Sequence, residues 1–418
     1  MDLCASVSGR GPAILLLAGL LLAAGCGGAG GGDVESLPFP PAGPDAVPEP
    51  SRPGPFPVGV KTFTLVDDSR SDPDTGQPRR LLTEVWYPAV QAAAAGPFWS
   101  YDVKTEVSPE LLGDKYAAFM AAELPLIETR TVRAAPLDRA RAPYPVILYS
   151  HGANSVRWQS IFYTARLASH GYVVIAPDHQ HNTIWDMIRD GYEAGSVVTS
   201  SYKRLDDMLF LLDHFLALSR TADDFFSGAL DGGRVGVTGH SFGGFTSVCM
   251  PCIDPRFRLA VAQSPVISLT IGWCDLDDYP APLMVQGGTA DVTVPWRDQY
   301  CDYRALGGDQ PRYLLELEDA GHYTFADICQ LDLLSLSEEL DLGGAVEDAL
   351  EDGCADYNLP WQQAHPIINH YAIALFNGRL RDSPGSLELL VAQDDPAFAA
   401  ARFFTGAVED FPDGGCAD

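Results

Sequence analysis

The stretch RVGVTGHSFGG, residues 234–244, joins a short β-rich run to a pentapeptide of the form G-x-S-x-G. A serine on such a sharp strand-to-helix turn has an exposed Oγ, and the small residues around it let neighbouring backbone approach closely. The backbone N–H after the serine, here that of Phe242, points towards the oxyanion that forms when the serine attacks. The N-terminus of the following helix faces the same oxyanion. The stretch therefore predicts Ser241 as a nucleophile and Phe242 as an oxyanion donor.

Five more β-rich runs surround this turn, and most have the nearly continuous apolar character of parallel strands covered on both faces. They are residues 145–150, 172–176, 258–263, 282–287 and 312–317. Residues 205–216 have a helical pattern, with apolar positions three and four apart. The alternation predicts an α/β fold with a mostly parallel central sheet and helices on both faces. Residues 61–66 and 81–87 predict an antiparallel hairpin at the sheet edge.

A catalytic serine needs a base and a carboxylate that orients the base. His322 follows the run at 312–317, so we expect it at the carboxyl end of a parallel strand, on the same sheet edge as Ser241. Asp291 follows the run at 282–287 in the same way, although a solvated turn aspartate is the alternative interpretation. We predict Ser241, Asp291 and His322 as a catalytic triad in this chain order.

A second oxyanion donor is expected in the loop after residues 145–150. Gly152 permits a tight turn there that can present the amide of Ala153 to the site. His151 is expected to brace this loop. His240 adjoins the nucleophile but leaves the turn in another direction, and His370 lies in a helical pattern that favours packing. Neither is expected to act as the base.

The N-terminal residues 1–26 have the features of an export signal, with Arg10 ahead of a 12-residue apolar run at 13–24. A membrane-spanning helix needs about 20 such residues, so this run is too short to span a bilayer. Small residues before Cys26 resemble the lipobox of bacterial lipoproteins, although Ala23 stands where that motif usually has a larger aliphatic residue. We predict an exported protein anchored to the membrane by lipid on Cys26; ordinary cleavage of a secreted protein is the alternative.

The rest of the chain is divided by composition. Residues 27–58 predict an extended tether, because Gly and Pro fill 16 of the first 31 positions. Residues 59–418 are expected to form the α/β domain. Within them, 100–140 contain a helical pattern near 109–122 and could lie over the site as a cap. Residues 330–357 carry nine acids and no Lys or Arg and predict an acidic, solvated insertion without EF-hand spacing.

The composition excludes two broad classes. With 27 Lys and Arg against 56 Asp and Glu, the net charge is −29, which makes a nucleic-acid backbone an unsuitable partner. The 46% apolar content is enough for a large core and excludes a wholly disordered chain.

Seven cysteines remain beyond the export signal. Outside the cytoplasm cysteines tend to pair, and an odd number leaves at least one free or bonded to another chain. Spacing does not determine the pairing, but Cys329 and Cys354 bracket the acidic segment, and we predict that they form a disulfide. Cys249 and Cys252 have CxxC spacing without a second such pair, which favours disulfides or buried thiols over a zinc site.

Together these features resemble the α/β-hydrolase superfamily and, within it, the platelet-activating factor acetylhydrolase and dienelactone hydrolase group. The matching pieces are EVWYP at 84–88, YSHG at 149–152, LASHGY at 167–172, GHSFGG at 239–244, DPRFR at 254–258 and GHYTFAD at 321–327. They run in order over residues 61–330, about two thirds of the chain. The resemblance implies an α/β-hydrolase fold and serine ester hydrolysis without a metal or organic cofactor. Residues 330–418 contain no matching motif.

The sequence departs from the acetylhydrolase pattern at the triad acid. In that branch the acid lies on the strand directly after the nucleophile helix, but here residues 258–263 run into Ser264 without a carboxylate. Asp291, at the commoner superfamily position, is therefore the predicted acid. The alternatives are Asp275, Asp277 and Asp278 in the intervening loop.

The resulting functional prediction is an exported serine carboxylic ester hydrolase that acts through an acyl-enzyme on a small or lipid-like ester. One alternative is a lipase or polyester hydrolase that acts on a surface. Another, from a different class, is a catalytically silent binding protein on the same fold.

Overall fold

The computed structural model describes residues 47–405, apart from 73–74, 125, 191–194, 271 and 331–349, together with Cys416. All of these residues belong to one unit, Leu37–Asp418. The predicted signal, the lipidation site Cys26 and most of the predicted tether lie outside the described residues. Within the described part of the chain, no helix combines the length and apolarity needed to cross a bilayer.

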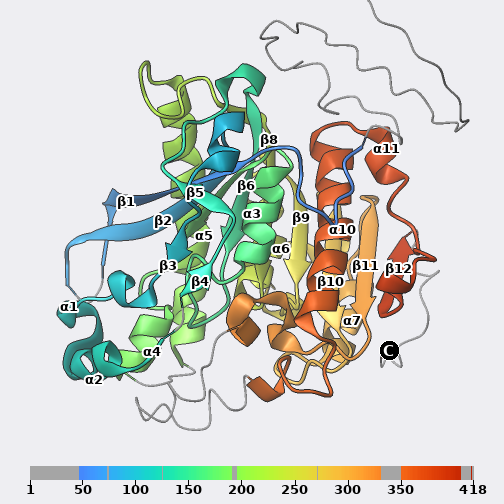
Figure 1. Cartoon of the computed structure of the whole chain (residues 1–418). Coiled ribbons are helices and arrows are strands. Elements are labelled where there is room, and N and C mark those ends of the chain that lie inside the picture. Colours follow the sequence, from blue (N-terminus) through green and yellow to red (C-terminus); the bar gives the residue numbers. More distant parts are fainter. Residues whose placement is uncertain are drawn as a thin grey trace, which may run out of the picture. The chain divides into compact units, whose positions relative to one another are not determined.

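A ten-stranded sheet runs through the described part of the chain (Figure 1). In spatial order its strands are β12 (Ala401–Thr405), β11 (Arg312–Leu317), β10 (Leu283–Gly288), β9 (Phe257–Gln263), β8 (Leu230–His240), β6 (Tyr144–Ser150), β7 (Val173–Pro177), β2 (Pro78–Pro88), β1 (Val58–Ser71) and β5 (Thr131–Arg133). Six neighbouring strands of this sheet are parallel, namely β11, β10, β9, β8, β6 and β7. They correspond to the six β-rich runs of the sequence. The predicted α/β class with a mostly parallel sheet is confirmed.

The two ends of the sheet differ from expectation. Strands β1 and β2 form the predicted antiparallel hairpin, but β5 pairs with β1 in parallel and lies outside it. At the other end β12 adds an antiparallel strand to β11. Both additions are short, three and five residues, so neither carries enough apolar pattern to be recognised in the sequence.

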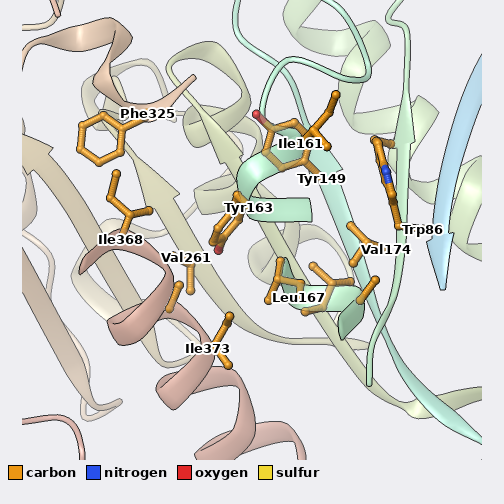
Figure 2. Packing of buried hydrophobic residues seen from close by; sticks show 14 of the residues in the cluster. Trp86, Tyr149, Ile161, Tyr163, Leu167, Val174, Val261, Phe325, Ile368 and Ile373 are labelled. Carbon is orange, nitrogen blue, oxygen red and sulfur yellow. The ribbon is translucent and has the colours of Figure 1, made fainter. Parts of the chain in front are cut away.

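Helices cover both faces of the sheet, as predicted. Helices α3 (Ile161–Ser169) and α10 (Trp361–Leu380) pack in one apolar cluster, drawn in Figure 2. Helices α5 (Gly195–Arg220), α6 (Phe242–Ile253) and α7 (Trp296–Arg304) contribute to a second cluster. Strand β6 supplies both, because Ile147 belongs to the first cluster and Val146 to the second. Alternate side chains of a strand point to opposite faces, so a strand covered on both sides is apolar throughout.

The predicted tether ends earlier than residue 58. Residues 47–57 lie against the body: the N–H groups of Gly54 and Phe56 donate to Oγ and O of Ser169, at 2.9 and 3.0 Å. Glu49 bonds His370 of α10 at 2.9 Å, and Phe56 is buried. The Gly and Pro content of a segment predicts an extended backbone. It does not reveal the few residues that attach the segment to the body.

The segment predicted as a cap folds into short pieces. Helix α1 (Pro109–Leu112) and helix α2 (Tyr116–Ala121) replace the single helix expected near 109–122. A 3-10 turn separates them, and it begins at Gly113, whose φ is +56°. Phe119 of α2 is buried on Trp185 of α4 (Ile184–Asp190), with ring centroids 5.9 Å apart. A role as a cap stays a prediction.

Three disulfides join described residues: Cys252–Cys274, Cys301–Cys416 and Cys329–Cys354. The predicted Cys329–Cys354 bond is confirmed. Cys249 is buried without a disulfide, and burial raises the pKa of its thiol. In the CxxC sequence, therefore, one cysteine bonds to a distant loop and the other packs in the core.

Candidate active site

Ser241 lies on the turn between β8 and α6, with φ +56° and ψ −117°. A non-glycine residue in this region stores strain that the surrounding structure must hold in place. The glycines two positions away make that possible. A Cβ on Gly239 or Gly243 would lie 2.4 or 1.8 Å from the carbonyl oxygen of Ser150, so β6 packs directly against the turn. The turn that carries the half-buried Ser241 is thus held by contacts that only glycine permits.

Asp291 and His322 come together at the ends of β10 and β11. His322 Nδ1 lies 2.9 Å from Asp291 Oδ2, and both side chains are buried. Two further donors hold the carboxylate: the N–H of Val294 donates to Oδ1 at 2.7 Å, and Gln299 Nε2 donates to Oδ2 at 3.0 Å. An ionised carboxylate only accepts hydrogen bonds, so Nδ1 of the imidazole is the donor and Nε2 can act as the base.

The loop after β6 lies beside the nucleophile. A Cβ on Gly152 would be 3.5 Å from the Cβ of Ser241, which places this loop next to the turn. Ala153 follows directly. Phe242 is the first residue of α6, and the first N–H groups of a helix have no partner within the helix. The structure therefore brings both predicted oxyanion residues to the surroundings of Ser241.

A chain of hydrogen bonds connects this loop to the loop that carries His322. Gly152 N–H donates to Gln159 Oε1 at 2.7 Å, Gln159 Nε2 donates to His240 Nδ1 at 2.6 Å, and His240 Nε2 donates to the carbonyl of His322 at 2.9 Å. Burial, followed by repulsion from His322, lowers the pKa of His240 well below its usual value. The ring is neutral, as the single donor and single acceptor of this chain require.

A buried arginine of α5 bonds the loop after β6, which carries Ala153. Arg204 donates to the carbonyls of His151 and Gly152 at 2.5 and 3.0 Å, and its guanidinium lies 4.7 Å from the ring centre of Phe242. Burial lowers its pKa to about 9, so it is a cation at neutral pH. Because a peptide unit is planar and trans, holding the Gly152 carbonyl also fixes the direction of the Ala153 N–H on its opposite side.

A second buried group supports the end of β6. Asp207 of α5 accepts from Arg79 Nε and His179 Nδ1 at 2.7 and 2.9 Å, and His179 Nε2 bonds Ser150 Oγ at 2.9 Å. Burial opposes ionisation of Asp207, but the hydrogen bonds from Arg79 and His179 hold its pKa well below the usual value. Burial also lowers the pKa of His179 to about 3, so its ring is neutral.

His151 and His370 lie where the sequence suggested. His151 is buried, bonds the Gly152 carbonyl through Nδ1 at 2.6 Å and accepts from the N–H of His179 at 3.0 Å, so it braces its loop. His370 is a buried residue of α10 and bonds Glu49.

The alternative acids lie elsewhere. Asp275, Asp277 and Asp278 are exposed, and Asp275 Oδ1 accepts from the N–H of Asp277 at 3.1 Å. Residues 276–278 form a 3-10 turn that starts from this contact. The carboxylate that bonds the imidazole of His322 is that of Asp291.

Several supporting residues were missed in the sequence, among them Gln159, Gln299 and Arg204. A lone Gln or Arg within a helix or loop has no spacing signal, since its partners come from distant segments. In the described part of the chain, no group of three or more His, Cys, Asp or Glu side chains could hold a metal ion.

Comparison with known proteins gives two family models. A PET hydrolase-like model matches residues 139–335, and a model of platelet-activating factor acetylhydrolase, isoform II, matches residues 47–192. Together with the relatives below, they confirm the resemblance to α/β-hydrolases of the acetylhydrolase-like group.

Two curated relatives are similar over part of their length. A probable 1-alkyl-2-acetylglycerophosphocholine esterase of Arthroderma benhamiae is 27% identical over 235 residues, which are 51% of this chain and 57% of the relative. A platelet-activating factor acetylhydrolase of Cavia porcellus is 28% identical over 156 residues, 29% of this chain and 35% of the relative. The chain thus spans less than two thirds of either relative.

Among solved structures, a ferulic acid esterase from Streptomyces cinnamoneus matches with a TM-score of 0.60 and 23% identity. The match covers 83% of this chain and 96% of the other. At this identity the likeness establishes the α/β-hydrolase fold alone.

Proposed function

We propose that the chain is an exported serine carboxylic ester hydrolase that acts through an acyl-enzyme. The observation that carries the proposal is the buried Asp291–His322 pair on the same sheet edge as Ser241, whose backbone is strained. The names of the curated relatives, an esterase and an acetylhydrolase, agree with ester chemistry.

In the proposed reaction His322 acts first as base, then as acid and then as base again, while the other groups keep one role each. His322 Nε2 takes the Ser241 proton while Oγ attacks the ester carbonyl, and Asp291 stabilises the imidazolium through Nδ1. The N–H groups of Ala153 and Phe242 donate to the oxyanion. The imidazolium then protonates the leaving alcohol, an acyl-serine remains, and water activated by His322 releases the acid. The buried cation Arg204 supports this arrangement, since it holds the carbonyl of the peptide that carries the Ala153 N–H.

The substrate is proposed as a small or lipid-like ester. A second candidate, an enzyme that degrades polyester or lipid at a surface, is favoured by the match to the PET hydrolase-like model. The third candidate, a silent binding protein, has no need of a buried Asp–His pair on the same sheet edge as a strained serine.

A fluorophosphonate probe together with p-nitrophenyl esters from acetate to palmitate tests these candidates. We expect the probe to label Ser241, and soluble short-chain esters to be hydrolysed without a jump in rate at the solubility limit. Such a jump would favour the surface enzyme. Absence of both labelling and hydrolysis would leave the silent binding protein. Peptide mapping of the labelled protein locates the modified serine.

Export and lipidation belong to the same proposal. The disulfides among described residues are typical of an oxidising compartment outside the cytoplasm. We expect the mature protein to begin at Cys26 with a diacylglyceryl group, because small residues precede this cysteine and a Gly/Pro-rich stretch follows it. Mass spectrometry of the N-terminal peptide from detergent-extracted membranes measures this. A mature protein in the culture fluid that begins at another residue would contradict it.

A further inference from the structure

The carboxylate of Asp352 binds the two loops that carry the predicted acid and base. It is 3% exposed and lies near the end of the acidic segment, residues 330–357. Oδ2 accepts from the N–H and Oγ1 of Thr293 at 2.8 and 2.7 Å, and from the N–H of Val292 at 3.2 Å. Oδ1 accepts from the N–H of His322 at 2.9 Å. Since Val292 and Thr293 directly follow Asp291, one buried carboxylate connects the acid loop to the base itself.

The backbone around Asp352 also lies tightly on the base loop. Its carbonyl accepts from the N–H of Tyr323 at 2.8 Å. A Cβ on Gly321 would lie 2.5 Å from the carbonyl carbon of Asp352, so this approach depends on glycine. Gly353 has φ +142°, which lets the chain turn away directly after the contact.

Three further contacts hold Asp352 in this place. The Cys329–Cys354 disulfide ties the chain two residues later to the segment after the base loop. Asn358 Oδ1 accepts from the N–H groups of Gly353 and Ala355 at 3.1 and 3.2 Å. The N–H of Leu359 donates to the carbonyl of Asp319, at the start of the base loop, at 2.7 Å. The chain around Asp352 is therefore attached both to the start of the base loop, at Asp319, and to the segment after it, at Cys329.

We infer that Asp352 is a positioning residue that sets the geometry of the Asp291–His322 pair, an inference that rests on the proposed ester hydrolase function. The two loops come from different strands, β10 and β11. They bond each other directly through the triad contact and through the Ala290 N–H, which donates to the carbonyl of Ala320 at 2.9 Å, and Asp352 adds a bridge at the residues that follow Asp291 and at His322 itself. A carboxylate that accepts four N–H and O–H donors forms strong, charge-assisted bonds and leaves several buried donors unpaired when it is lost. Asp352 lies beyond all the motifs of the resemblance, which end at residue 330, and thus gives the acidic insertion a role in catalysis.

The test is Asp352→Asn in the full-length protein, assayed with a p-nitrophenyl ester and with active sites counted by fluorophosphonate. The amide removes the charge and turns an NH₂ group towards backbone donors. We expect kcat per titrated site to fall by about 10- to 100-fold, because a displacement of about 1 Å can cost that much. KM should change by less than about threefold, since no substrate contact is lost. The matched control is Asp356→Asn, an exposed acid four residues later, which should keep the wild-type kcat.

The count of active sites separates positioning from folding. A merely structural role would lower the number of titrated sites or the melting temperature but leave kcat per titrated site unchanged, and that result overturns the inference. An equal loss in Asp356→Asn also overturns it, because the effect would then come from net charge. If Asp352→Asn does not fold, the double variant Cys329→Ser/Cys354→Ser, which removes the covalent one of the three contacts that hold Asp352, is measured instead. A lower kcat per titrated site supports the inference and a wild-type value overturns it. A wild-type protein that neither reacts with the probe nor hydrolyses esters refutes the proposed function itself, so the two failures are distinguishable.

Discussion

Ser241→Ala is expected to lower ester hydrolysis by about 10⁴- to 10⁶-fold, the range seen when the nucleophile of a serine protease triad is removed. Without Oγ no acyl-enzyme can form, and only substrate binding and the oxyanion donors remain. The measurement is kcat for a short-chain p-nitrophenyl ester, with enzyme in excess so that slow turnover is still visible. Labelling by the fluorophosphonate probe should disappear as well.

The fold should survive this change. Alanine differs from serine by a single oxygen atom, and the strained turn is held by the contacts of Gly239 and Gly243 with β6, which the variant keeps. We expect a circular dichroism spectrum like that of the wild type and a melting temperature within a few degrees. Near-wild-type turnover in a folded Ser241→Ala protein would refute the proposed mechanism at its first step.

Prediction from sequence placed residues correctly where their position follows directly from strand order. Ser241, Asp291 and His322 each come shortly after a β-rich run, and parallel strands place their carboxyl ends on one edge. The central strands were recognisable because burial on both faces makes them apolar throughout. The shape of the strand-to-helix turn also led us to expect that the His240 side chain points away from the nucleophile. In the structure this side chain bonds Gln159.

The supporting residues could not be predicted, because their contacts are tertiary. Asp352 is one of nine acids between residues 330 and 357, and nothing in its spacing distinguishes it from Glu351 and Asp356, which are exposed. Arg204 directly precedes the apolar stripe of α5. A charged residue at such a helix position is usually solvated, yet Arg204 is fully buried. The burial of a charged residue can be recognised only when the groups that pair with it are known. Here they come from separate loops, with the carbonyls of His151 and Gly152 about 50 residues away and Asn182 22 residues away.

The geometry around Asp291 makes a sharp prediction for Asp291→Asn. The N–H of Val294 donates to Oδ1, and a backbone N–H cannot become an acceptor, so the amide oxygen of the variant should take this position. The NH₂ group then replaces Oδ2, where it faces His322 Nδ1 and also the Nε2 donor of Gln299. A donor there favours the tautomer with its proton on Nε2, which cannot accept the Ser241 proton, and no charge remains to stabilise the imidazolium. The shape of the site is kept while its base is lost.

We therefore expect Asp291→Asn to lower kcat by up to about 10⁴-fold with little change in melting temperature, as the corresponding change does in another triad. The matched controls are Asp275→Asn, Asp277→Asn and Asp278→Asn, which alter exposed carboxylates of the intervening loop and should keep wild-type kcat. All four variants are measured with the same short-chain ester and normalised to titrated active sites. If Asp291→Asn keeps more than about a tenth of the activity, far above the loss expected for a triad acid, while one of the three controls abolishes it, the acid lies in the loop after β9. His322 would then have to exchange its 2.9 Å contact with Asp291 for one with that loop during the reaction.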